Sequence, residues 1–220
     1  DPLWGAMTVM NYEGEVKAVA GGIGEKKVNR GFNCAIDSKR QPGSTMKPIS
    51  VYAPAIERGL INYSTLLNDT KTSYGKWTPK NAGGGYSGNM TAQKAIERSI
   101  NTIPVALAQK MGVQNCYNFL TDNMGLKNLT DLDLNLSSLG LGGTNGGITT
   151  LESAAAYAVF GNGGLYYEPT FYTKVCDQKG KELQKEEVYS LFQQEYLHVT
   201  GPYQLLSYKF FEEREHGEDQ

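Results

Sequence analysis

The order of the periodic patterns along the chain is the feature that most constrains its fold. Apolar and polar side chains alternate in two runs near the N-terminus, Ala6–Met10 and Val16–Ala20, which the turn Asn11–Gly14 separates. This alternation predicts a β-hairpin. Helical patterns fill the middle, and residues 167–183 read as a strand, a turn at 178–180 and the start of another strand. With strands at both ends, we expect an α+β fold in which helices pack against an antiparallel sheet.

The composition excludes several classes of protein. The 220 residues are 40% hydrophobic and 20% charged, as in ordinary globular domains. A net charge of -2 without a block of Lys and Arg gives no reason to expect a nucleic-acid partner. No apolar run approaches the length of a membrane span. The chain begins at Asp1 without an initiator methionine, so we expect it to be a piece of a longer protein.

The cysteines do not predict a disulfide framework. Cys34, Cys116 and Cys176 are odd in number and far apart, and this spacing also argues against a clustered metal site. The only histidines, His198 and His216, lie near the end of the chain. We therefore expect no clustered metal site among these residues.

The middle of the chain predicts a series of helices. The first begins at Ser44, has apolar residues at Ile49, Tyr52, Ala53 and Ile56, and ends at Gly59. Residues 62–90 are rich in loop formers. Further helices are expected at Thr91–Arg98, from about Pro104 to Gly112, at Gln114–Met124, and from the capping box Thr149–Glu152 to Gly161.

Ser44 and Lys47 are one helical turn apart, so their side chains share a face of the first predicted helix. The simpler interpretation is a helix start with a capping serine and a solvated lysine. The alternative is a serine nucleophile with its own base. A serine hydroxyl needs a base to accept its proton, and a lysine can serve only if burial or nearby positive charge lowers its pKa. The tetrapeptide Ser44–Lys47 alone does not decide between the two.

Ser99-Ile100-Asn101 lies between two predicted helices. In the simpler interpretation Ser99 ends one helix, and Asn101 or Thr102 caps the next. In the functional one, the Ser99 hydroxyl relays a proton and the Asn101 amide binds the backbone of a substrate. The tripeptide alone does not decide between these two interpretations.

Several longer strings occur together and in order: GEVKAVAGG, FNCAIDSKRQPGSTMKP, WTPKN, TAQKAIERSINTIPVALAQKMG and LGGTNGGITTLESAAAYAVFGNGGLYYEP. This set closely resembles the transpeptidase domain of class A (bifunctional) penicillin-binding proteins, from about Ala6 to about Val188. Ser-x-x-Lys and Ser-x-Asn are the first two of that family's three active-site motifs. The resemblance implies a serine β-lactamase/transpeptidase-like fold.

The resemblance also implies a serine-type D-Ala-D-Ala transpeptidase without cofactor. Ser44 would attack the penultimate D-alanine carbonyl of a peptidoglycan stem peptide, and Lys47 would take its proton. Ser99 would relay a proton to the departing D-alanine, and Asn101 would contact Lys47 and the substrate. β-Lactam antibiotics would acylate Ser44 in the same way. The parent protein is expected to be anchored at the outer face of the bacterial cytoplasmic membrane, with a glycosyltransferase domain upstream.

The third motif of the family, Lys-Thr-Gly or Lys-Ser-Gly on an inner strand, is missing. The nearest string is His198-Val-Thr-Gly-Pro202, and a simple loop explains it better. From Leu191 onward the sequence no longer follows the family. We therefore expect a partial transpeptidase domain at residues 1–190, an incomplete C-terminal part of the fold, and a divergent or frame-shifted tail at residues 191–220.

Two other classes of function remain open on the sequence. A non-catalytic penicillin-binding sensor or scaffold would keep the fold without turnover, and the missing third motif is compatible with it. A serine β-lactamase would share Ser44 and Lys47 but needs a base that activates a deacylating water, and no residue stands out for that role.

Overall fold

The computed structural model describes residues 4–25, 31–172, 174–177 and 179–183. Its strands are β1 (Met7–Met10), β2 (Val16–Ala20), β3 (Leu66–Asp69) and β4 (Gly88–Thr91). Its α-helices are α1 (Ala53–Glu57), α2 (Ala92–Glu97), α3 (Thr102–Met111), α4 (Val113–Asn118), α5 (Leu136–Leu141) and α6 (Thr150–Ala158). The predicted boundary near residue 190, the tail and the Thr200-Gly201 string lie outside the described residues.

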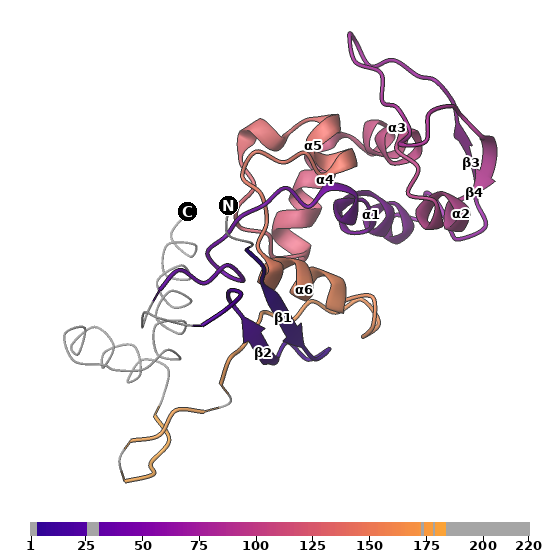
Figure 1. The fold of residues 1–220 in the computed structure, drawn as a ribbon. Coiled ribbons are helices and arrows are strands. Elements are labelled where there is room, and N and C mark those ends of the chain that lie inside the picture. Colours follow the sequence, from indigo (N-terminus) through magenta and orange to yellow (C-terminus); the bar gives the residue numbers. More distant parts are fainter. Residues whose placement is uncertain (1–3, 26–30, 173, 178, 184–220) are drawn as a thin grey trace.

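The strands form two separate antiparallel hairpins at opposite ends of the described structure (Figure 1). β1 pairs with β2 as predicted, with Met7 opposite Ala20 and an irregularity at Val9 and Met10. Helix α6 packs beside β1. Residues 167–183 form only single bridges, Glu15 with Thr170 and Cys176 with Glu182, so the strands predicted there are not found among the described residues.

The hairpin β3–β4 corrects the prediction that residues 62–90 form loops. Leu66–Asp69 pairs with Gly88–Thr91, and the connection between them contains the glycine-rich stretch around residues 83–85. Neither strand has the β-branched alternation that identifies a strand locally. Asp69, at the end of β3, instead accepts hydrogen bonds from Asn81 and from the Ser87 backbone, which lie in the connection to β4.

The helical segment that begins at Ser44 is less regular than predicted. It starts as a 3₁₀ turn at Gly43–Thr45, passes through a π-helical segment at Pro48–Tyr52 and continues as α1. Pro48 lacks the N–H that would close an α-helical bond to Ser44, which accounts for irregular bonding here. The segment ends at Gly59 as predicted, with φ +66°.

The same segment was expected to pack on the sheet, and this expectation is wrong for the described residues. Its π-helical part contacts α3, α4 and α5. Ile49 and Tyr52 are buried in the core formed with these helices. Ile56, which was predicted to lie on the same apolar face, is 51% exposed. The residues around Lys47 are thus held by helices on several sides.

The other predicted helices agree with the structure. Thr91 caps α2 by accepting a hydrogen bond from the backbone of Lys94, and Gly112 ends α3. Thr149 and Glu152 form the predicted capping box of α6. The segment predicted at Gln114–Met124 is α4 followed by a π-helical turn, Phe119–Asn123.

Candidate active site

Lys47 is the centre of the candidate site. Its side chain is buried, with the residue 3% exposed, and it begins one turn after Ser44. Its ammonium nitrogen donates to three acceptors: the Ser99 carbonyl oxygen at 2.8 Å, the Ser99 Oγ at 3.1 Å and the Asn101 Oδ1 at 2.6 Å. An ammonium has three N–H donors, so all three are used.

The turn between α2 and α3 is shaped to supply two of these acceptors from one residue. Ser99 has φ +49°, and no other non-glycine residue of the described structure has a positive φ. In this left-handed conformation both its carbonyl and its hydroxyl reach Lys47. A serine in this region costs about 1–3 kcal/mol, and such strain is found mainly at functional sites.

The Asn101 side chain is oriented from both ends. Its Nδ2 donates to the Lys80 carbonyl at 2.7 Å, so its Oδ1 is the atom that faces Lys47. Its backbone N–H donates to Asn81 Oδ1 at 2.9 Å. The alternative interpretation, in which the Asn101 side chain caps α3, fails because that side chain makes no capping bond.

Ser44 is exposed in the 3₁₀ turn that opens the segment. Within the part of the chain that the structure describes, no hydrogen bond joins its hydroxyl to Lys47. The physical reason is that the three N–H groups of the ammonium already donate to Ser99 and Asn101. The predicted residues therefore come together as Lys47, Ser99 and Asn101, with Ser44 on the solvent side of the same segment.

Burial lowers the pKa of Lys47 to about 8. Desolvation disfavours the charged amine, and no salt bridge to Lys47 forms among the described side chains. A substantial fraction of the amine is then neutral slightly above neutral pH. Such an amine can accept a proton from a neighbouring hydroxyl.

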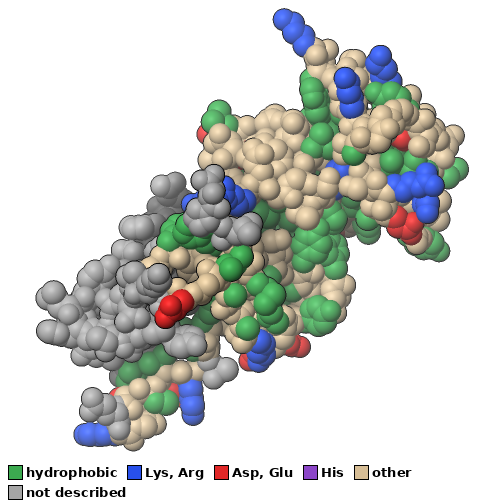
Figure 2. Space-filling view, viewed as in Figure 1, with side chains coloured by type: hydrophobic (Ala, Val, Ile, Leu, Met, Phe, Trp, Pro, Cys, Tyr) green, Lys and Arg blue, Asp and Glu red, His purple; other side chains and the backbone are tan. Residues whose placement is uncertain are grey.

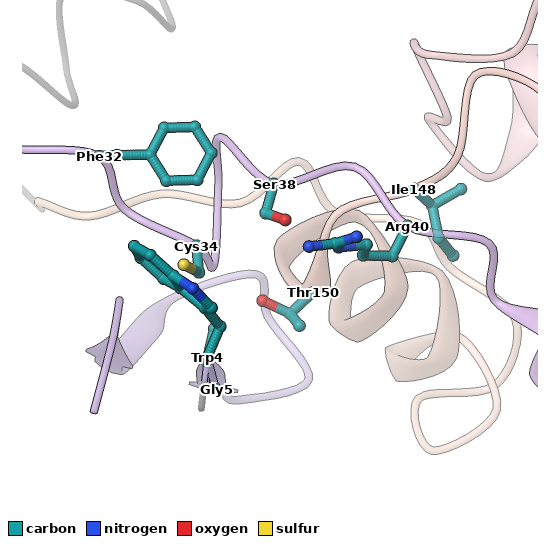
Figure 3. A pocket seen from close by; sticks show the side chains of 9 residues that line it. Trp4, Gly5, Phe32, Cys34, Ser38, Arg40, Ile148 and Thr150 are labelled. Atoms are coloured by element: carbon teal, nitrogen blue, oxygen red, sulfur yellow. The ribbon is translucent and has the colours of Figure 1, made fainter. Parts of the chain in front are cut away.

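A cavity of about 560 Å³ lies elsewhere, between the N-terminal hairpin and the start of α6. Trp4 and Phe32 border it, and the Arg40 guanidinium points into it near Ser38 and Thr150 (Figure 3). None of the four candidate residues lines this cavity. It therefore does not mark the site that the sequence predicts.

The described residues contain no group of three or more His, Cys, Asp or Glu side chains placed to hold a metal ion. None of their helices has the length and apolar character required to cross a bilayer. On the face shown in Figure 2, hydrophobic side chains are exposed around β1 and α6.

Comparison with known proteins identifies the family. The model of the penicillin-binding protein transpeptidase domain matches residues 5–198. Penicillin-binding protein 1A of Clostridium acetobutylicum is 39% identical over 191 residues, which cover 81% of this chain and 23% of that protein.

Two solved structures are similar as well. Penicillin-binding protein 1A from Haemophilus influenzae is 33% identical, with a TM-score of 0.69 over 81% of this chain and 26% of that one. The PonA1 protein from Mycobacterium tuberculosis in complex with penicillin V has a TM-score of 0.69 at 23% identity, covering 84% of this chain and 51% of that one; it supports the fold alone. The chain thus spans about a quarter of the first two proteins, and it belongs to the penicillin-binding protein transpeptidase family.

Proposed function

We propose that this chain performs the acyl transfer of a serine-type peptidoglycan D,D-transpeptidase, with Ser44 as nucleophile and Lys47 as base. Ser99 relays a proton, and Asn101 orients Lys47 and binds the substrate backbone. The observation that carries the proposal is the buried Lys47 amine, which Ser99 and Asn101 hold one turn after an exposed serine.

The hydrogen bonds explain how Lys47 alternates between acid and base. As an ammonium it donates to the Ser99 carbonyl, the Ser99 hydroxyl and Asn101 Oδ1. As a neutral amine it keeps two N–H donors, and the carbonyl and the amide oxygen accept them because neither can donate. The amine lone pair is then left for a hydroxyl. Ser99 supplies one at 3.1 Å, and in the proposed reaction Ser44 supplies the other.

The proposed reaction balances with these groups alone. Ser44 Oγ bonds to the penultimate D-alanine carbonyl carbon, and its proton passes to the neutral Lys47 amine. The C–N bond to the terminal D-alanine breaks, and the proton moves from Lys47 through Ser99 to the departing amine. An amine of a second stem peptide then attacks the acyl carbonyl carbon and forms the amide bond of the cross-link, while the ester bond to Ser44 Oγ breaks. One proton of the attacking amine returns to Ser44 Oγ.

The setting of this reaction is part of the proposal. The substrates are stem peptides that end in D-Ala-D-Ala, and β-lactam antibiotics are substrate mimics that acylate Ser44. The site works outside the cytoplasmic membrane, in a parent protein that is membrane-anchored and carries a glycosyltransferase domain. We further propose that the absence of a Lys-Thr-Gly motif from the sequence slows acylation, because a strand with that motif would supply an oxyanion donor and a carboxylate anchor.

The test is acylation of the full chain by benzylpenicillin, followed by intact mass and peptide mapping. We expect one adduct on Ser44, formed more slowly than in the Clostridium acetobutylicum relative. Ser44→Ala removes the adduct. Thr45→Val, which deletes the neighbouring exposed hydroxyl and its hydrogen bond to Pro42, retains it.

The same experiment separates the other candidate functions. An adduct that is released within minutes indicates a β-lactamase. A folded chain that forms no adduct after prolonged incubation contradicts the proposal and favours a non-catalytic sensor or scaffold. A rate equal to that of the relative contradicts the proposed impairment.

A further inference from the structure

Asp69 is a buried carboxylate at the end of β3, behind the candidate site. The residue is 1% exposed. It accepts hydrogen bonds from Thr102 Oγ1 at 2.6 Å, from Asn81 Nδ2 at 2.8 and 3.0 Å, and from the Ser87 backbone N–H at 2.8 Å. Within the described part of the chain it has no salt bridge, so these bonds alone compensate for its desolvation.

The partners of Asp69 lead directly to Asn101. Asn81 uses its amide nitrogen for Asp69 and its Oδ1 for the Asn101 backbone N–H. The residue before Asn81, Lys80, accepts the Asn101 side-chain amide through its carbonyl oxygen. Thr102 follows Asn101 in the chain and is tied to Asp69 by its hydroxyl. Asp69 therefore fixes the backbone on both sides of Asn101.

We propose, on the basis of the function proposed above, that Asp69 is a positioning residue for acyl transfer. Through Asn81 and Thr102 it holds Asn101 in the orientation in which Oδ1 meets the Lys47 amine. The reverse amide orientation would point an NH₂ group at Lys47 and lose both the bond to Lys47 and the bond to Lys80. The hairpin β3–β4 and its connection thus support the site through Asn101.

The carboxylate acts on the site through its hydrogen bonds to Asn81, Ser87 and Thr102, none of which reaches Lys47 directly. An asparagine at position 69 has nearly the same size but only one acceptor oxygen, and its NH₂ group opposes the donors of Asn81 or Ser87. Asp69→Asn therefore weakens the support of Asn101 without replacing any residue that contacts Lys47.

Asp133 provides a matched control. It is also fully buried, at 0% exposure, and it accepts bonds from Thr130, Asn145 and Gly146. None of these bonds reaches Lys47, Ser99 or Asn101. Asp133→Asn consequently disturbs a buried carboxylate of the same kind whose hydrogen bonds do not lead to Asn101.

The first measurement is the benzylpenicillin acylation rate of both variants, at a temperature where circular dichroism shows each to be folded. We expect Asp69→Asn to lower the rate by about tenfold to a hundredfold, as small misplacements of reacting groups do. Asp133→Asn remains close to the wild-type rate. Equal rates for the two variants would overturn the positioning role.

A second measurement does not depend on activity. Hydrogen exchange of the Asn101 backbone amide, followed by NMR, reports its bond to Asn81. Asp69→Asn accelerates this exchange by about tenfold, the factor expected for one lost hydrogen bond, and Asp133→Asn does not. Unchanged exchange in Asp69→Asn overturns the proposal. A wild-type chain that forms no adduct contradicts the proposed function instead, and the exchange measurement then decides the link from Asp69 to Asn101.

The double variant Asp69→Asn/Asn81→Asp adds a rescue. It exchanges the acid and the amide between the two positions. The amide introduced at position 69 can then donate to the carboxylate introduced at position 81, and this carboxylate still accepts from the Asn101 backbone N–H. We expect the double variant to recover part of both the acylation rate and the amide protection lost in Asp69→Asn. A double variant with the losses of the two single changes added together would contradict a pathway through Asn81.

Discussion

The Lys47 amine nitrogen lies 2.6 Å from Asn101 Oδ1, although the two residues are 54 positions apart in the sequence. The contact joins the helical segment after Ser44 to the turn between α2 and α3. Because the Lys47 amine is buried, this turn and this segment cannot separate without leaving the amine without its acceptors. Ser99 and Asn101 are thereby held at the Lys47 amine, one helical turn after Ser44.

The acylation rate should rise with pH around the pKa of Lys47. Burial lowers this pKa to about 8, and the reaction requires the neutral amine. Below pH 8 most of the folded protein holds the charged form, so the rate falls as pH decreases. Above pH 8 the neutral form predominates and the rate reaches a plateau. The measurement is the rate of Ser44 adduct formation by benzylpenicillin at a series of pH values from about 6.5 to 9.5.

Lys47→Arg is the control for this profile. An arginine keeps the positive charge but stays protonated across the whole range, so it cannot take the Ser44 proton. We expect almost no adduct at any pH. A wild-type rate that is flat or decreases between about pH 7 and 9 would contradict the role of Lys47 as the base.

The sequence predicts the candidate residues of this site more readily than the framework around them. Ser44, Lys47, Ser99 and Asn101 stand in short motifs with recognisable neighbouring strings, and the structure brings Lys47, Ser99 and Asn101 into contact. The helical turn predicted a contact between Ser44 and Lys47, and the family resemblance implied the contact between Asn101 and Lys47, which the structure has. Tertiary structure instead offers Lys47 three acceptors from Ser99 and Asn101, which no local pattern shows.

The hairpin β3–β4 shows a second feature that could not be predicted from the sequence. The N-terminal hairpin was predicted because its apolar residues alternate. β3 and β4 do not alternate in this way, and the Asp69 bonds to Asn81, Ser87 and Thr102 hold their long connection. An aspartate in a stretch rich in turn residues looks like an ordinary loop residue in the sequence. Its burial is visible only in the folded protein.

Gly142 should be required for the placement of Ser44. It ends α5 with φ +74°, and a Cβ there would collide with the backbone of Gly43, the residue before Ser44. The Gly43 N–H also donates to the Gly142 carbonyl. Gly142→Ala must therefore displace the turn that carries the nucleophile. We expect lower thermal stability and a slower acylation rate, measured by calorimetry and by mass spectrometry.

Gly59→Ala is the matched control for that change. Gly59 has a similar φ of +66°, but nothing lies within 4 Å of an added Cβ. The Gly59→Ala variant therefore introduces conformational strain but no steric clash, and this strain costs about 1–2 kcal/mol for a left-handed residue. Its acylation rate should remain that of the wild type. A Gly142→Ala variant that acylates as fast as Gly59→Ala would show that the contact with Gly43 does not place Ser44.

Ser50 should contribute to the stability of the segment behind the site. The residue is fully buried, and its hydroxyl lies 2.8 Å from the Met46 carbonyl and 2.6 Å from the Leu139 carbonyl. Ser50→Ala leaves the Leu139 carbonyl without this donor and costs about 1–2 kcal/mol. Urea unfolding should show this loss, and the melting temperature should fall by about 2–4 °C per kcal/mol. Leu139 belongs to α5, and Ser137→Ala, at an exposed position of that helix, should change neither value appreciably.

Asp69 should also make the folded protein sensitive to acid. Burial alone would raise its pKa, but hydrogen bonds from Thr102, Asn81 and Ser87 outweigh burial and hold the pKa below its usual range. The folded state therefore binds the proton less tightly than the unfolded chain, whose aspartates titrate near about 3.9. This contribution to stability is complete above that value and is lost as the pH falls through the lower folded pKa.

Urea unfolding between about pH 7 and 3 measures this contribution of Asp69. The free energies of unfolding of the wild type and Asp69→Asn should converge as the pH decreases, because the variant has no carboxylate to protonate at this position. Glu13→Gln, which removes an exposed carboxylate from the turn between β1 and β2, should follow the wild-type curve. Parallel curves for the wild type and Asp69→Asn would mean that the Asp69 carboxylate does not stabilise the folded state through these bonds.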